Sequence, residues 1–85
     1  MTQIAGIRVY WDTQGTVEGW SCEIMGRDDE GLLYTIETYG LNAETDDDPR
    51  ELVVQEAFSH DIEIRADQCA YEPHQDGGWA DWTRD

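Results

Sequence analysis

One stretch decides the fold: residues 46–59, which read DDDPRELVVQEAFS. Asp48 is a typical N-cap, Pro49 suits the first position of a helix, and Glu51 stands at the capping-box position. Behind them, one apolar stripe at helical spacing is formed by Val53, Val54, Ala57 and Phe58, with Leu52 at its edge. The stretch therefore predicts an amphipathic helix over Pro49–Ser59.

Outside this helix the apolar residues alternate with polar ones, which is typical of half-buried strands. We expect three strands before the helix and one after it, at residues 4–12, 17–25, 32–39 and 62–67. Turn residues join the first three strands into a meander, which needs cover on its apolar face. The sequence predicts an α+β domain with the order β-β-β-α-β, in which one amphipathic helix covers an antiparallel β-meander.

The alternation also assigns faces to the strands. The residues expected to face the core from the second strand are Trp20, Cys22 and Ile24. Those expected to face it from the third strand are Leu32, Tyr34 and Ile36, with Leu33, Thr35 and Glu37 facing outward.

The C-terminal part of the sequence has a weaker pattern. We expect a compact domain over residues 1–67 and an irregular C-terminal tail over 68–85, because the tail contains Pro73, Gly77 and Gly78. One helical turn in the tail would bring Trp79 and Trp82 together. The pair either packs back on the sheet or anchors a partner, since Trp is enriched in interfaces.

The net charge is the most unusual property of the chain. Its 85 residues carry 20 acidic and 5 basic side chains, a net charge of −15, and every basic residue is an arginine. A small domain needs a charge of only about 2–8 to stay soluble, so partner binding is one explanation of the excess. Phosphate groups repel such a surface, which argues against nucleic acid and anionic membranes as ligands.

The two cysteines and the apolar segments bear on location. Cys22 and Cys69 lie far apart, no stretch has the length of a transmembrane helix, and residues 1–6 lack the features of a signal peptide. The sequence therefore predicts a cytoplasmic protein without a disulfide framework.

No motif indicates catalysis, a cofactor or a metal. Asp46, Asp47 and Asp48 are contiguous and precede a proline, so their side chains diverge instead of converging on one ion. Glycine-rich phosphate loops and nucleophile elbows are absent from the sequence. We therefore expect a protein that is not an enzyme and that carries no cofactor and no metal.

The acidic residues form two clusters along the third strand. Asp28, Asp29 and Glu30 lie at the preceding hairpin tip, and the cluster at 46–48 follows the strand. A strand of this length spans roughly 26 Å at about 3.3 Å per residue, so the clusters are expected at opposite ends of the sheet. The candidate partner-binding residues are Asp28, Asp29, Glu30, Glu37, Asp46, Asp47, Trp79 and Trp82.

In size, acidity and absence of catalytic residues, the chain resembles the small acidic anti-restriction and anti-CRISPR inhibitors of phages and mobile elements. The resemblance is one of composition, and no residue role carries over. It implies a DNA-mimic inhibitor, monomeric or homodimeric, that occupies a basic nucleic-acid-binding surface of a host defence complex. The alternative is a salt-adapted acidic interaction or accessory module without mimicry, because proteins adapted to molar salt are also acidic and poor in lysine.

Overall fold

The computed structural model describes residues 3–12, 19–41, 48–74 and 77–84 of the chain. The elements in these residues are β1 (Gly6–Asp12), β2 (Gly19–Arg27), β3 (Leu33–Leu41), α1 (Pro49–Ser59), a 3₁₀ turn η1 (Ala66–Gln68), β4 (Ala70–His74) and β5 (Gly77–Thr83). The predicted α+β class, with an antiparallel meander followed by one amphipathic helix, is confirmed.

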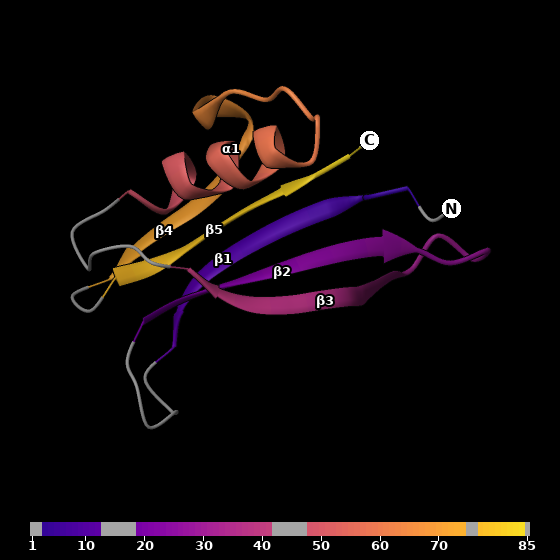
Figure 1. Cartoon of the computed structure of the whole chain (residues 1–85), viewed down its shortest axis with the longest axis horizontal. Helices are drawn as coiled ribbons and strands as arrows, with labels where there is room; N and C mark the ends of the chain where they lie inside the picture. Colours follow the sequence, from indigo (N-terminus) through magenta and orange to yellow (C-terminus); the bar gives the residue numbers. More distant parts are fainter. Residues whose placement is uncertain (1–2, 13–18, 42–47, 75–76, 85) are drawn as a thin grey trace.

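The strands form one antiparallel sheet in the order β3-β2-β1-β5-β4 (Figure 1). The first three strands are neighbours in sequence, as a meander requires. The last hairpin, β4–β5, joins the sheet through β5, which pairs with β1. As a result β3 and β4 are the two edges, and strands from both ends of the chain meet at the centre.

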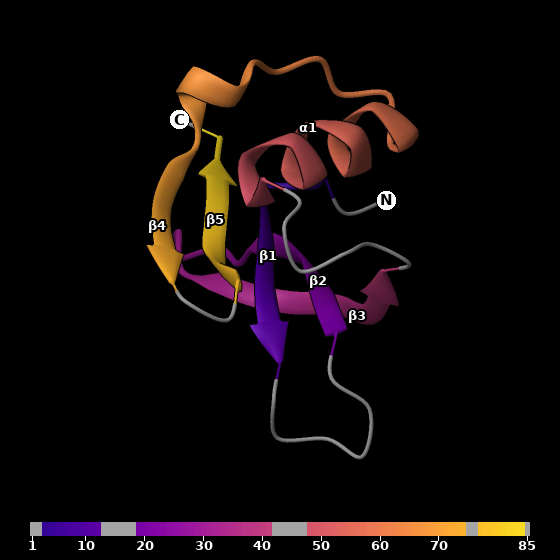
Figure 2. The same ribbon diagram turned by 90° about the vertical axis from the view of Figure 1, so that its left-hand side faces the viewer.

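Helix α1 lies over β1 and β5 and covers one face of the sheet (Figure 2). Its start follows the predicted cap, because the Asp48 carboxylate accepts a hydrogen bond of 2.9 Å from the backbone N–H of Arg50. The core between helix and sheet consists of Ile7, Val9, Trp20, Cys22, Ile24, Leu52, Val53, Ala57, Ala80 and Trp82. This face of the sheet is called the covered face below, and the other the open face.

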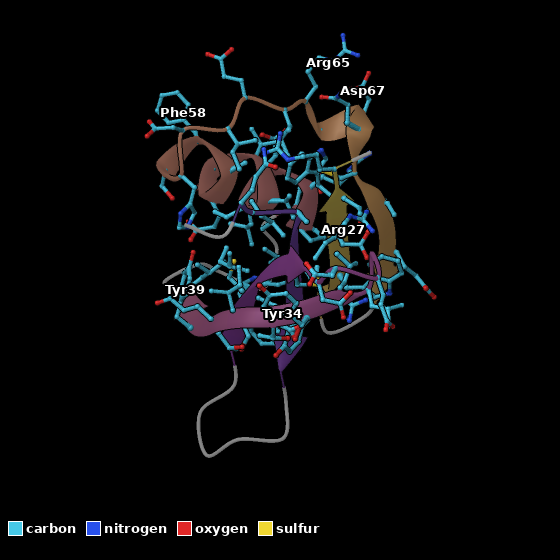
Figure 3. The ribbon with its side chains drawn as sticks, turned by 90° about the vertical axis from the view of Figure 1, so that its right-hand side faces the viewer. Arg27, Tyr34, Tyr39, Phe58, Arg65 and Asp67 are labelled. Carbon is cyan, nitrogen blue, oxygen red and sulfur yellow. The ribbon has the colours of Figure 1, made fainter. Side chains whose placement is uncertain are left out.

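The apolar stripe of the helix is shifted from the predicted one. Leu52 is buried, whereas Phe58 is 71% exposed and points away from the sheet (Figure 3). The helix ends immediately beyond, where Asp61 adopts a φ of 63° and the N–H of Ile62 bonds the carbonyl of Ala57. The stripe is therefore centred on Leu52, Val53 and Ala57.

The expected strand at 62–67 is wrong. Residues 62–65 belong to no strand, and η1 follows them. Ile62 and Ile64 do pack against the core while Glu63 and Arg65 are exposed. The alternation of apolar and polar residues therefore predicted correctly which side of this extended segment is covered. A strand also needs a neighbouring strand for its backbone hydrogen bonds, and the alternation does not predict that.

The irregular tail expected at 68–85 is also wrong, since β4 and β5 occupy most of it. Gly78 adopts a φ of 105°, a conformation that glycine adopts without strain, at the start of β5. The compact domain expected over residues 1–67 therefore also includes this hairpin, because β5 supplies Ala80 and Trp82 to the core. The order after the helix is therefore two strands instead of one.

The predicted inward face of β3 is not buried. Leu32, Tyr34 and Ile36 are exposed by 61%, 42% and 44%. Their place is taken by Tyr39 and Leu41, which lie opposite Cys22 and Trp20 and pack against the core. A bulge, at which Ile24 pairs with Glu37 and Met25 with Thr35, places Tyr34 opposite Gly26 on the same face as Tyr39. Tyr34 is exposed there because α1 packs over β1 and β5, whereas β3 is the edge strand beyond β2.

Candidate docking surface

The open face of the sheet carries two rows of side chains, which the strand register defines. The first row runs from Asp81 through Arg8 and Glu23 to Thr38. The second contains, in order across the sheet, Glu72, Trp79, Tyr10, Ser21 and Gly40. The first row is mostly charged, and the second places two aromatic rings between a carboxylate and two small residues.

The two rows enclose a shallow cavity of about 320 Å³ lined by Arg8, Tyr10, Glu23 and Trp79, called the open-face slot below. Trp79 and Tyr10 lie directly opposite each other on β5 and β1, and both are half-buried. The indole Nε1 of Trp79 donates a hydrogen bond of 3.2 Å to the Glu72 carboxylate, which fixes the ring. On the other row, Arg8 forms an ion pair of 3.7 Å with Asp81.

Trp79 and Trp82 do not form the pair that a helical turn would produce. They belong to β5, where residues three apart point to opposite faces. Trp82 is 8% exposed and packs in the core, whereas Trp79 faces the open side. The two candidate tryptophans are therefore separated by the sheet, and only Trp79 lies on a surface.

The hairpin tip holds the first acidic cluster, and all three of its carboxylates are exposed. Asp28 also shapes the turn, because its Oδ1 accepts hydrogen bonds of 2.9 Å from the backbone N–H groups of Glu30 and Leu32. Gly31 completes the turn with a φ of 83°. Asp29 and Glu30 are thus held at an ordered tip beside β3.

The remaining candidate carboxylates lie along and beyond β3. Glu37 is exposed on this edge strand. Asp46 and Asp47 lie outside the described residues. The side chains of Leu33, Tyr34 and Ile36 are exposed beside Glu37, so the edge presents apolar as well as acidic groups.

Every arginine of the chain is engaged by the chain itself. Arg50 binds the Asp48 carboxylate at 2.9 Å and lies over the Tyr71 ring, 4.2 Å from its centroid. Arg84 lies over the Trp82 ring and donates to the carbonyl of Ile4. The other three contacts are Arg8 with Asp81, Arg27 with the carbonyls of Gly31 and Arg84, and Arg65 with Asp67.

The ion pair between Arg50 and Asp48 shifts the pKa values of both side chains. The Arg50 guanidinium hydrogen-bonds the Asp48 carboxylate and holds its pKa below the usual range. The same contact raises the pKa of Arg50. Both groups are therefore charged at neutral pH, and the pair lies at the first turn of α1.

A second polar cluster lies between β2, β3 and α1. The hydroxyl of Tyr39 donates a hydrogen bond of 2.5 Å to the Glu56 carboxylate. Burial raises the pKa of the Cys22 thiol to about 11, and burial together with the Glu56 contact also raises the pKa of Tyr39. A thiol and a phenol that stay protonated at neutral pH are poor nucleophiles and bases. The contribution of this cluster is structural, because the hydrogen bond from Tyr39 to Glu56 links the edge strand β3 to helix α1.

The described parts of the chain contain no metal-binding cluster and no membrane-spanning helix. No group of three or more histidine, cysteine, aspartate or glutamate side chains is placed to hold a metal ion there. None of the helices described is long and apolar enough to cross a membrane.

The chain matches no protein-family model, no curated protein and no solved structure. Its residues alone therefore carry the functional argument. Sequence reasoning missed the open-face slot, because Tyr10 and Trp79 become neighbours only through the pairing of β1 with β5. The alternation in 4–12 places Tyr10 on the outward face, and that is the one local signal for the slot.

Proposed function

We propose that this protein acts by binding and not by catalysis, as an acidic inhibitor that occupies a basic, nucleic-acid-binding surface of another protein. One observation carries the proposal: all five arginines are engaged within the chain, which has 20 acidic residues in total. The described residues form three ion pairs. Most of the negative charge is therefore left for solvent or for a partner.

The arrangement of this charge supports a basic partner. The exposed carboxylates at the hairpin tip continue along β3 with Glu37 and lie beside exposed apolar side chains. Unpaired carboxylates steer a basic surface and form charge-assisted hydrogen bonds with its arginines. The apolar neighbours add contact area, which charge alone does not supply. A nucleic-acid-binding groove carries the matching positive charge, because it has to neutralise phosphates.

The first experiment identifies the partner and the mode of inhibition. Immobilised protein captures binding proteins from a lysate at low salt, and each captured protein is then purified and retested. We expect the partner to bind nucleic acid, and we expect duplex DNA or RNA to compete with this protein for it. Labelled duplex alone should not shift with this protein at moderate salt. Partners that bind nucleic acid and this protein simultaneously would contradict the proposal.

Charge-neutral variants locate the binding surface. One variant carries Asp28→Asn, Asp29→Asn and Glu30→Gln, and the asparagine at 28 keeps the oxygen that shapes the turn. A second carries Asp46→Asn and Asp47→Asn, which spares the cap at Asp48. Both should slow association with the partner and reduce its salt dependence, because such charges act mainly on the association rate.

A matched control removes the same charge from the helix side. Glu51→Gln, Asp61→Asn and Glu63→Gln change three exposed carboxylates on and after α1. This variant should bind the partner nearly as fast as the parent. Equal effects of the hairpin and helix variants, together with unfolding in dilute buffer and refolding in molar salt, would favour the salt-adapted accessory module.

A further inference from the structure

The open-face slot has the shape and chemistry of a site for a single planar cation. We propose that it binds an arginine side chain of the partner, with the guanidinium stacked on Tyr10 and Trp79 and paired with Glu23. The inference deepens the proposed function and depends on it for the source of the arginine. It concerns the open face, away from the hairpin tip where the acidic cluster lies.

The geometry of the slot is set by backbone pairing and one side-chain contact. Tyr10 and Trp79 are direct cross-strand partners, so their rings are neighbours on the open face. Ser21 and Gly40 continue the same row and are too small to cover the Tyr10 ring. Glu72 holds the Trp79 indole N–H, which leaves the ring itself to line the slot. The site is therefore formed before any ligand arrives.

The electrostatics of the slot favour a cation. Arg8 is the one basic side chain in the two rows, and it already pairs with Asp81. Glu23 lines the slot on the other side of Arg8, and Glu72 lies beyond Trp79. Three carboxylates against one guanidinium leave an excess of negative charge. A cation over the faces of tryptophan or tyrosine gains further attraction from the ring.

Arginine fits better than lysine because the guanidinium is planar. It stacks on aromatic rings and presents a fork of N–H donors to a carboxylate. The chain uses the same pairing twice within itself, with Arg50 over Tyr71 at 4.2 Å and Arg84 over Trp82 at 5.4 Å. In contrast to those two rings, Tyr10 and Trp79 have no arginine recorded over them in the described structure, although Arg8 lines the same slot.

Two aromatic rings on an open sheet face also suit the stacking of nucleotide bases. The charge argues against this ligand, because a strand binder needs basic residues for the phosphates. Here the chain carries −15, and the one arginine of the slot is paired with Asp81. The base-stacking alternative is therefore an outcome that the experiment has to separate.

The experiment titrates the whole protein with N-acetyl-arginine amide, with N-acetyl-lysine amide and with a single-stranded oligonucleotide. The indole N–H signals of the four tryptophans are followed by nuclear magnetic resonance. We expect saturable shifts at Trp79 with the arginine amide, weaker ones with the lysine amide, and none with the oligonucleotide. The buried Trp82 serves as an internal reference. Shifts at Trp79 with the oligonucleotide, or equal responses to arginine and lysine, would overturn the inference.

Substitutions test the aromatic contribution. Tyr10→Leu keeps apolar bulk but removes the ring, and it should weaken arginine binding about two- to fivefold, while Tyr10→Phe should retain it. Glu23→Gln removes the carboxylate that lines the slot and should also weaken arginine binding. The variant at Asp28, Asp29 and Glu30 removes more charge than Glu23→Gln, but it lies outside the slot and should affect the small probe less. If Tyr10→Leu binds the arginine amide as well as the parent does, the rings do not form the site.

The failures of the two proposals are distinguishable. A partner whose binding depends on the hairpin carboxylates but is unchanged by Tyr10→Leu would refute the slot and leave the proposed function standing. Arginine binding in the slot without any nucleic-acid-competitive partner would refute the proposed function instead. Loss of partner binding in Tyr10→Leu, with Tyr10→Phe active, supports both.

Discussion

The two edges of the sheet differ in length, composition and attachment. Strand β4 has five residues, includes Pro73, and has Tyr71 beneath the guanidinium of Arg50. Strand β3 has nine residues and no proline, and its exposed side chains include Leu33, Tyr34 and Ile36. Proline and short length block the addition of another strand, whereas a long apolar edge invites it. The contrast indicates that β4 is closed to further pairing and β3 is open.

The edges also differ in how they are tied to the helix. Helix α1 contacts β4 and η1 directly. Within the described residues, the hydrogen bond between Tyr39 and Glu56 links α1 to β3. The rest of the support of β3 comes from its pairing with β2 and from Tyr39 and Leu41, which pack at the margin of the core. The bulge at Ile36 bends this edge and gives it partial protection. We therefore expect β3 to be the less stable of the two edges and also the one that more readily pairs with a strand of another chain.

The largest expected effect on stability comes from Trp20, a core residue of β2 that packs beside β3. Trp20 is 1% exposed, lies opposite Leu41 and contacts Trp11 edge to face with ring centroids 5.4 Å apart. Trp20→Ala should lower the free energy of unfolding by about 3–5 kcal/mol. Chemical denaturation measures the loss, and hydrogen exchange should show β3 losing protection before β4. A loss under about 1 kcal/mol would mean that this core position is misassigned.

Alkaline pH should destabilise the fold through Cys22. The folded thiol has a pKa of about 11, against 9.0 for an ordinary cysteine. The unfolded chain therefore releases this proton first, so the stabilisation is complete below pH 9 and is lost as pH rises toward 11. Two pKa units correspond to at most about 3 kcal/mol. Denaturation midpoints measured between pH 8 and 11 should fall, and Cys22→Ala should flatten the curve.

Cys69 is the matched control on the β4 side. Burial raises its pKa to about 11 as well, but the side chain is partly exposed to solvent. Cys69→Ala should therefore flatten the pH curve less than Cys22→Ala. The opposite order would place the more sensitive region at β4.

A smaller loss is expected when β3 is detached from the helix. Tyr39→Phe removes the hydrogen bond to Glu56 and should cost about 1 kcal/mol, because the bond is only partly buried. Thermal unfolding provides the measurement. The same substitution at Tyr71 keeps the ring under Arg50 and should leave the stability of the protein unchanged. Equal losses at the two tyrosines would show that the edges are attached alike.

The smallest effect on stability is expected at the exposed bulge. Ile36→Thr keeps the β-branched shape and should change the free energy of unfolding by less than about 0.5 kcal/mol. At molar salt, where the mutual repulsion of the chains is screened, the parent should associate through β3, and this variant should associate less. Sedimentation velocity measures this association. Phe58→Thr removes an equally apolar exposed side chain from α1 and should not reduce it.

Local signals predicted the parts of the fold that depend on neighbours in sequence. The helix with its cap at Asp48 and the alternation of β1 and β2 were identified because caps and side-chain periods are set within a few residues. The β4–β5 hairpin was missed for two reasons. The buried residue of β5 beneath the helix is Ala80, which is too small to mark an apolar face, and β5 pairs with β1, which is distant in sequence. The burial predicted for Leu32, Tyr34 and Ile36 was wrong because α1 packs over β1 and β5, and no local pattern shows which part of a strand a helix covers.

For the candidate site, too, the sequence predicted the features that depend on local residues and missed those that depend on distant ones. The hairpin carboxylates are exposed as expected, because a charged turn between glycines has few other places to lie. Trp79 and Trp82 were assigned to one cluster by helical spacing, and the strand separates them. The slot between Tyr10 and Trp79 depends on long-range register, which a single sequence does not encode in any local pattern.

The pairing of β1 with β5 also orders events on the ribosome. Strand β1 is synthesised before β5, so its second neighbour appears only after residues 77–83 have emerged. Until then Ile7 and Val9 lack the cover of Trp82 and Ala80, and one side of β1 has no strand beside it. Contacts between such distant segments slow folding. The nascent chain therefore stays incomplete, and open to aggregation or chaperone binding, until β5 is synthesised.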